Sequence, residues 1–208
     1  IENDANCFAL SETIDGAASE QKIVFAAILG TGVGGAICID QKLLTGLNKI
    51  CGEWGHNPLP WPSTSEDGQE LEGVTCYCGK NSCIETLLSG EGLRRSYAKL
   101  SGQEILHTHS AAEIHKLSHE GDIFATRALE LYASRLAKSL ATVINILDPS
   151  IIVLGGGLSN IQFLYERVPQ LWSQWVFSDK TNTRLVKNQH GDSSGVRGAA
   201  RLWSEPDK

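Results

Sequence analysis

The longest helical pattern in the chain, residues 122–148, leads directly into a strand-like segment, and this succession constrains the fold more than any other feature. In the helical segment, apolar residues recur at spacings of three, four or seven; they are Leu129, Leu136, Leu140, Val143 and Leu147. The pattern stops at Asp148-Pro149, and "SIIVLGGGLS" follows as a short β-rich run that contains three glycines. Buried strands that alternate with helices indicate the α/β class.

Two further strand-like runs precede this helix and are expected to pair with each other. They are "KIVFAAIL" and "GAICID", and the glycine-dense segment "GTGVGG" joins them. Other helices are expected, the first from an Asn/Asp cap signal, over residues 4–18, 84–98 with a break at Ser89-Gly90, 160–175 and 193–203. Residues 42–72 contain three prolines and several glycines, so we expect a loop there.

Size and charge narrow the class of protein. The 208 residues suffice for one large domain or two small ones, and the net charge of −6 comes with no lysine- or arginine-rich block, so we expect no nucleic-acid partner. No apolar run approaches the ~20 residues of a membrane span. No leader pattern is visible, which favours a cytoplasmic protein. The chain starts without methionine, apparently within an element, and we interpret it as a fragment of a longer protein.

Three of the six cysteines lie together in "CYCGKNSC". Disulfides are not expected in a cytosolic chain, and the C-x-x-C spacing of a redox pair is absent. Thiolates at Cys76, Cys78 and Cys83 suit zinc, which takes four tetrahedral ligands, and His56 is the best candidate for the fourth. The alternative is that these are three small buried thiols. The remaining cysteines occur singly and are expected to pack in the core: Cys7, Cys38 and Cys51.

Carboxylates lie on both sides of these proposed metal ligands. Glu53 lies three residues before His56 in "GEWGH", and Glu85 lies two residues after Cys83. Carboxylates accept hydrogen bonds from the hydroxyls of a polar ligand, although Glu85 alone is also explained as an acid in the first turn of a helix. Asp4, at the start of the first helix, would be either a helix cap or a general base toward a hydroxyl.

Two glycine-rich loops have the character of phosphate-binding turns. Gly30, Thr31 and Gly32 lie between two strand-like runs, where backbone N–H groups can converge on an anion. The segment Gly155 to Gly157 lies between a strand and a helix, an arrangement that directs a helix N-terminus toward a phosphate. Tight turns explain either loop alone. Together with the carboxylates, the two loops favour a nucleotide and a polyhydroxyl substrate.

These residues, in this order, resemble the ROK family of sugar kinases and related repressors. The resemblance covers the chain nearly end to end and is carried by "ENDANC", "LGTGVGG", "GEWGHNPLPW", "CYCGKNSCIET", "NILDPSIIVLGGGLSN" and "HGDSSGVRGAA". Within the family, "GHNPLPW" together with "CYCGK…CIET" looks most similar to bacterial fructokinases, including the manno(fructo)kinase type. N-acetylglucosamine kinases come second, because they share "ENDANCFALSE" and the C-terminal run.

The resemblance implies an α/β fold related to actin and hexokinase (ribonuclease H-like), in which two lobes close around ATP and sugar. This chain would be mainly the second lobe, because the Asp-x-Gly-Gly-Thr motif of the first lobe is not in it. The implied division is residues 1–18 as the end of the first lobe, 19–190 as the second lobe with a zinc-binding loop over 51–85, and 191–208 as a C-terminal helix that could pack back on the first lobe.

The resemblance also assigns roles to individual residues. Asp4 matches the base that deprotonates the sugar's 6-hydroxyl, and the nucleotide would contact the two glycine loops, at Gly30, Thr31, Gly32, Gly155, Gly156 and Gly157. The sugar contacts would be Asn3, Glu53, His56 and Glu85, with one imidazole nitrogen of His56 on zinc and the other facing the sugar. The zinc ligands would be His56, Cys76, Cys78 and Cys83.

The implied activity is ATP-dependent phosphorylation of fructose, with mannose or glucose as further substrates. The alternatives are an N-acetylglucosamine kinase of the same family and a sugar-responsive repressor, and the isolated fragment is expected to be inactive. Structural Zn²⁺, ATP and Mg²⁺ are the implied cofactors, and a homodimer is the implied assembly.

Overall fold

The structure, a computed structural model, describes residues 2–63 and 74–202. The helices are α1 (Asp4–Ile14), α3 (Ile84–Leu88), α4 (Gly90–Ser101), α5 (Ala111–His119), α6 (Ile123–Leu147), α7 (Phe163–Trp172) and α8 (Ser194–Arg201). The strands are β1 (Ile23–Leu29), β2 (Val33–Ile39), β3 (Lys42–Leu43), β4 (Ile151–Gly155) and β5 (Arg184–Lys187). Short 3-10 helices cover Trp54–His56, Ile105–His107, Gly157–Asn160 and Gly191–Ser193.

The five strands form one mixed sheet in the order β3-β2-β1-β4-β5. β1 pairs antiparallel with β2, which confirms the expected hairpin, and parallel with β4. β4 in turn pairs parallel with β5. Because Ile28 lies opposite Gly155 in the register, β1 and β4 end at the same edge of the sheet, and the two glycine-rich loops follow there.

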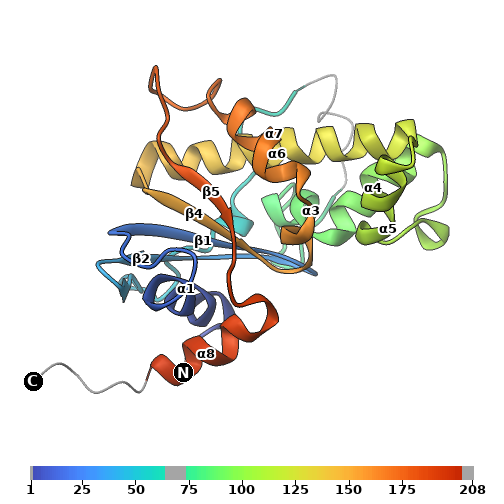
Figure 1. Cartoon of the computed structure of the whole chain (residues 1–208). Helices are drawn as coiled ribbons and strands as arrows, with labels where there is room; N and C mark the ends of the chain where they lie inside the picture. Colours follow the sequence, from blue (N-terminus) through green and yellow to red (C-terminus); the bar gives the residue numbers. More distant parts are fainter. Residues whose placement is uncertain (1, 64–73, 203–208) are drawn as a thin grey trace, which may run out of the picture.

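Helices cover both faces of the sheet (Figure 1). On one face, the side chains of Phe25, Leu29, Ile152 and Leu154 join the large core formed mainly with α3 to α7. On the other face, strand residues such as Val24 and Val153 pack with the apolar side of α1. The last helix, α8, packs against α1, so both lie on the side of the sheet opposite α6 and α7.

The periodic segment predicted as a long helix is α6, which Asp122 caps by accepting from Ala125 N, and the expected break at Ser89-Gly90 separates α3 from α4. α1 is shorter than expected, since it ends at Ile14 just before Asp15-Gly16. Within the expected loop 42–72, β3 and the 3-10 helix Trp54–His56 form, and residues 64–73 lie outside the described residues. Trp203 of the expected terminal helix lies outside them too.

The sequence analysis did not predict α5 or β5. α5 begins with a capping box in which the Ser110 side chain accepts from the backbone of Glu113, and the Glu113 side chain accepts from the backbone of Ser110. β5 is four residues long and owes its place to pairing with β4. Among the described residues, no helix is long and apolar enough to cross a membrane.

Candidate functional site

The proposed metal ligands come together in space. One ligand atom from each of His56, Cys76, Cys78 and Cys83 lies within 4.8 Å of the other three. The Cys76 Sγ to His56 Nδ1 distance is 3.6 Å, and the Cys78 Sγ to Cys83 Sγ distance is also 3.6 Å. Ligand atoms about 2.0–2.3 Å from a tetrahedral zinc ion lie roughly 3.4–3.8 Å apart, so these spacings fit zinc.

Backbone hydrogen bonds hold the four ligands in place although they come from separate segments. The cysteine turn is closed by Cys76 N donating to Lys80 O at 2.8 Å. The segment after His56 pairs with the end of this turn, because Ile84 N donates to Asn57 O at 2.8 Å and Pro58 forms a β-bridge with Cys83. The cluster is therefore built into a fixed loop pair.

The thiols have the electrostatics of a cation site. Burial raises the pKa of the Cys83 thiol, and the neighbouring Cys78 and Cys76 sulfurs raise it further. The backbone N–H of Lys80 lowers the pKa of Cys78. Three sulfurs this close repel one another as thiolates, and a divalent cation removes that repulsion. The donor set thus fits zinc by chemistry as well as by distance.

Glu85 links this cluster to the sheet. It lies in the first turn of α3, as its position predicted, and its Oε2 accepts from the backbone N of Val33 at 2.9 Å. Its Oε1 lies 3.7 Å from the Sγ of Cys76, which donates to it. Because Val33 is the first residue of β2, directly after the turn Gly30–Gly32, Glu85 connects the proposed metal ligands to the first glycine loop.

The Glu53 segment packs against the same start of β2. The indole Nε1 of Trp54 donates to Gly34 O at 2.9 Å, and its ring packs edge-on against Phe25 with 5.5 Å between ring centroids. Gly35 leaves room for this ring, since an added Cβ would lie 2.6 Å from Trp54 Cδ1. Buried Trp54 thereby fixes the backbone next to Glu53, whose own side chain is exposed.

The first turn of α1 brings Asn3 and Asp4 to the same strand. Asn3, and not Asp4, is the N-cap: its Oδ1 accepts from Asn6 N at 2.7 Å, which corrects the alternative that Asp4 caps the helix. Asp4 is exposed. Its neighbour Ala5 packs beside Gly34, where an added Cβ would lie 3.4 Å from the Ala5 Cβ. Asp4 thus lies at the end of α1 that packs beside the start of β2, and its Oδ1 accepts from Ala5 N at 2.9 Å while the residue stays exposed.

The two glycine loops meet at the sheet edge. Gly156, with φ of 79°, lies so close to the Leu29 carbonyl that no side chain fits between them. A cavity of about 450 Å³ opens beside this contact; its lining consists of Gly156, Ser159, Asn160, Lys187, Asn188, Gln189 and Gly191. The exposed hydroxyl of Thr31 lies in the neighbouring turn. Of the predicted glycines, Gly156 lines this cavity.

Sequence reasoning missed Tyr77, which lies between two of the proposed zinc ligands. Its hydroxyl is 3.0 Å from His56 Nε2, and its ring packs edge-on against the imidazole at a centroid distance of 5.2 Å. The carboxylates of Glu85 and Glu53 raise its pKa, with Glu85 the larger contributor. The Tyr77 hydroxyl thus lies among the groups predicted to contact a sugar. No local pattern in the sequence signals this contact.

Comparison with known proteins agrees with this arrangement. A family model for the ROK family matches residues 1–206. The N-acetyl-D-glucosamine kinase of Photobacterium profundum is 40% identical over 202 residues, which make up 97% of this chain and 65% of that protein. The chain thus spans slightly less than two thirds of the curated relatives it matches.

Solved structures match nearly the whole chain. The ROK hexokinase from Thermus thermophilus superposes with a TM-score of 0.80 at 28% identity, over 96% of this chain and 62% of that one. The ROK family glucokinase from Streptomyces griseus, crystallised with glucose and AMPPNP, gives a TM-score of 0.84 at 26% identity, over 97% and 67%. The expected hexokinase-like α/β fold is confirmed, and this chain belongs to the ROK family.

Proposed function

We propose that this chain carries the sugar- and nucleotide-binding part of an ATP-dependent hexose kinase whose substrate is N-acetylglucosamine. One observation carries the proposal: three separate segments with candidate sugar-binding acids converge on the first residues of β2. Glu85 bonds to Val33 N, Trp54 holds the Glu53 segment on Gly34, and the Asp4 end of α1 packs beside Gly34. This strand start directly follows the glycine turn proposed to hold phosphate.

In this proposal several polar side chains orient the sugar through hydrogen bonds. Asn3, Glu53, His56 and Glu85 accept hydrogen bonds from its hydroxyls or donate to them. Asp4 takes the proton of the attacking 6-hydroxyl, which its exposed position allows. Zinc, when bound by His56 and the three cysteines, would fix the loop that carries these groups. A sugar hydroxyl that contacts His56 Nε2 takes the place of the Tyr77 hydroxyl seen there.

The nucleotide is proposed to lie across the sheet edge where β1 and β4 end. Open parallel sheets bind phosphates beyond the carboxyl ends of their strands, where the turn Gly30–Gly32 lies. Gly30 N donates to Gly32 O at 3.0 Å and closes this turn, so the amides of Thr31 and Gly32 are the proposed phosphate donors. The cavity of about 450 Å³ beside Gly156 is the proposed place for the rest of the nucleotide. Phosphoryl transfer depends mainly on positioning and charge stabilisation, and Mg²⁺ on the phosphates would supply part of the latter.

The choice of sugar follows from the relatives. The curated relatives that match at about 40% identity are named N-acetyl-D-glucosamine kinases, which supports the alternative substrate, N-acetylglucosamine, over the expected main substrate, fructose. Fructose stays the competing candidate, on the run "GHNPLPW". The repressor alternative is less favoured, because a repressor transfers no phosphoryl group and needs no general base such as the exposed Asp4. The two-lobe division, the homodimer and the cytoplasmic location remain predictions from the resemblance.

The test is a coupled kinase assay of the full-length protein with N-acetylglucosamine, fructose, mannose and glucose at equal concentrations. We expect N-acetylglucosamine to give the highest kcat/KM, because a site built to bond one donor pattern rejects sugars that leave its polar groups unpaired. A higher kcat/KM for fructose would overturn the substrate assignment. ATP-independent sugar binding without turnover would favour the repressor.

A further inference from the structure

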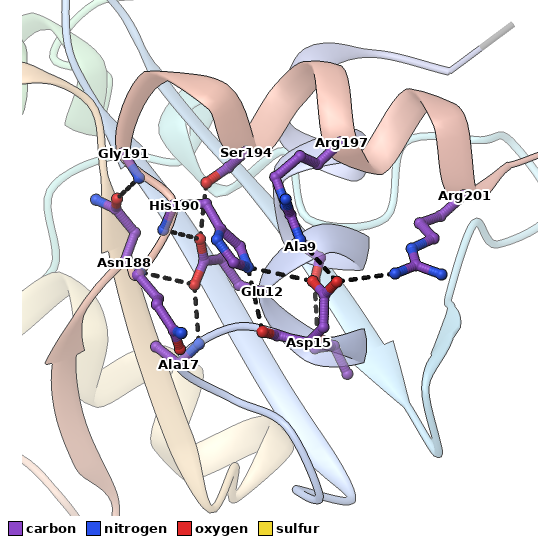
Figure 2. A network of polar contacts seen from close by, with 12 residues as sticks. Ala9, Glu12, Asp15, Ala17, Asn188, His190, Gly191, Ser194, Arg197 and Arg201 are labelled. Atoms are coloured by element: carbon purple, nitrogen blue, oxygen red, sulfur yellow. Dashed lines mark hydrogen bonds and ion pairs between the residues drawn. The ribbon is translucent and has the colours of Figure 1, made fainter.

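The buried carboxylate of Glu12 is the most completely bonded acid among the described residues that the proposed mechanism does not use. It lies in α1 and has no exposed surface. Its Oε2 accepts from Ala17 N at 3.0 Å and from Gln189 N at 2.9 Å, and its Oε1 accepts from His190 N at 3.2 Å and from Ser194 Oγ at 2.7 Å. Figure 2 shows this carboxylate between α1 and the chain that leads into α8.

We propose that Glu12 is a positioning residue for the nucleotide, an inference that rests on the proposed function. Two of its four donors are backbone amides of the segment 188–191, and three residues of that segment line the 450 Å³ cavity: Asn188, Gln189 and Gly191. Glu12 therefore holds one wall of the proposed nucleotide site from behind, without touching the nucleotide itself.

The same wall is held from the sheet side by Asn188. Its Nδ2 donates to Leu154 O at 3.0 Å and to Ser159 Oγ at 3.2 Å, and its Oδ1 accepts from Gly191 N at 2.6 Å. The short segment is thus fixed on both sides. The Asn188 side chain bonds to a carbonyl of β4, and the Glu12 carboxylate of α1 accepts from the backbone amides of Gln189 and His190. Without the carboxylate, its amides at Gln189 and His190 would lose their acceptor.

α1 also contacts the start of the second glycine loop, directly before the lining residue Gly156. The Phe8 ring lies directly against Gly155, where an added Cβ would be 2.6 Å from the ring. α1 also begins with the proposed base Asp4, and Glu12 lies about 12 Å further along the helix at about 1.5 Å per residue. One rigid helix therefore holds the wall segment 188–191 and also contacts Gly155, which directly precedes the lining residue Gly156, while it carries Asp4 at its start; such a common support suits the alignment of the phosphate with an attacking hydroxyl.

A purely structural role accounts for less of this arrangement. An apolar side chain in place of Glu12 would leave its four donors without an acceptor, and two of these donors belong to the cavity wall. α8 already has a separate anchor in Asp15, which accepts from Arg197 at 2.7 Å and Arg201 at 2.8 Å (Figure 2). Only the Ser194 bond of Glu12 reaches α8 itself, and the two amide bonds at Gln189 and His190 hold the cavity wall.

The experiment compares Glu12→Gln with Arg197→Gln in the full-length protein. Dissociation constants for ATP and for N-acetylglucosamine are measured separately by calorimetry, and amide hydrogen exchange is followed at Gln189 and His190. We expect Glu12→Gln to weaken ATP binding at least tenfold, to leave sugar binding within twofold, and to speed exchange at one of the two amides, because the single carbonyl oxygen of Gln can replace only one of the two carboxylate oxygens. Arg197→Gln, which removes a contact between α8 and Asp15 and leaves the contact of Asp15 with His190 in place, should leave the ATP constant within twofold.

A folded Glu12→Gln protein with unchanged ATP affinity would overturn the inference, and so would equal losses for ATP and sugar. If Glu12→Gln does not fold, Glu12→Asp keeps the charge but is one methylene too short to reach both amides, and the same ATP-selective loss is required of it. Wild-type protein that binds ATP but phosphorylates none of the four sugars would refute the proposed function, while the ATP comparison still decides on Glu12.

Discussion

Replacing Gly155 by alanine tests the contact between α1 and the second glycine loop. The added Cβ would lie 2.6, 2.7 and 3.1 Å from three carbon atoms of the Phe8 ring. Carbon atoms in contact are normally about 3.5–4.0 Å apart, so the ring or the loop has to move by about 1 Å. Overpacking of this kind costs about 1–3 kcal/mol. For a protein of this size, that predicts a Tm lower by about 2–12 °C.

The control lies two residues further along the same loop. At Gly157, an added Cβ meets no atom within 4 Å, so Gly157→Ala should change the stability by less than about 0.5 kcal/mol. Scanning calorimetry of both variants measures the difference. If Gly155→Ala melts within a degree or so of Gly157→Ala, the two elements are not in the contact described.

A double mutant makes the test specific. Phe8→Leu removes part of the ring that the new Cβ meets, although it destabilises by itself because the ring is buried. The loss of stability caused by Phe8→Leu should be smaller in the Gly155→Ala protein than in wild type, by about 1 kcal/mol or more. Additive losses would mean that the strain of Gly155→Ala arises somewhere other than at Phe8.

Three further variants test the proposed chemistry, the metal site and the α1–α8 contact. Asp4→Asn in the full-length enzyme should lower kcat by about 10²–10⁴, because it removes general-base catalysis alone, and steady-state assays measure this. Cys78→Ser should lose the bound metal and lower the Tm, which elemental analysis and calorimetry follow. The hydrogen bond from Arg201, with help from Arg197, lowers the pKa of Asp15 below its ordinary value of 3.8. The ionised carboxylate therefore stabilises the fold above that value and loses its effect as the pH falls through the lowered pKa. The Tm difference between wild type and Asp15→Asn should therefore shrink as the pH falls from about 5 toward about 3.

Each of these expectations has a contrary result. Near-wild-type turnover of Asp4→Asn would remove this residue from the mechanism. Cys78→Ser protein that keeps its metal and its Tm would exclude Cys78 as a ligand. A Tm gap for Asp15→Asn that persists unchanged in acid would mean that its charge contributes nothing to the α1–α8 contact.

Local signals in the sequence were sufficient for much of the fold. The apolar period predicted α6, and the dense glycines between "KIVFAAIL" and "GAICID" predicted the β1–β2 hairpin. The strand β5 could not be predicted in this way, because four residues carry too little pattern and their place depends on pairing with β4. α5 did have a local signal, the capping box at Ser110 and Glu113, which the sequence analysis did not use.

In the candidate site, too, contacts with a local signal in the sequence could be predicted, and contacts between distant segments could not. The spacing of the cysteines predicted a cluster with His56, and the structure brings these four side chains within 4.8 Å. The contact of Glu85 with Val33 N joins residues 52 positions apart, and that of Glu12 with Gln189 N joins residues 177 positions apart. No periodicity or spacing within a segment reports such contacts, since they arise only when the helices pack on the sheet.

The measurement that tests the central claim most directly is the metal content and metal coordination of purified, tag-free protein. Elemental analysis should find one zinc per chain, and X-ray absorption at the zinc edge should fit three sulfur ligands at about 2.3 Å and one nitrogen at about 2.0–2.1 Å. Protein without stoichiometric zinc, or zinc bound only by oxygen, would contradict the account that His56, Cys76, Cys78 and Cys83 hold a metal next to the sugar-binding acids.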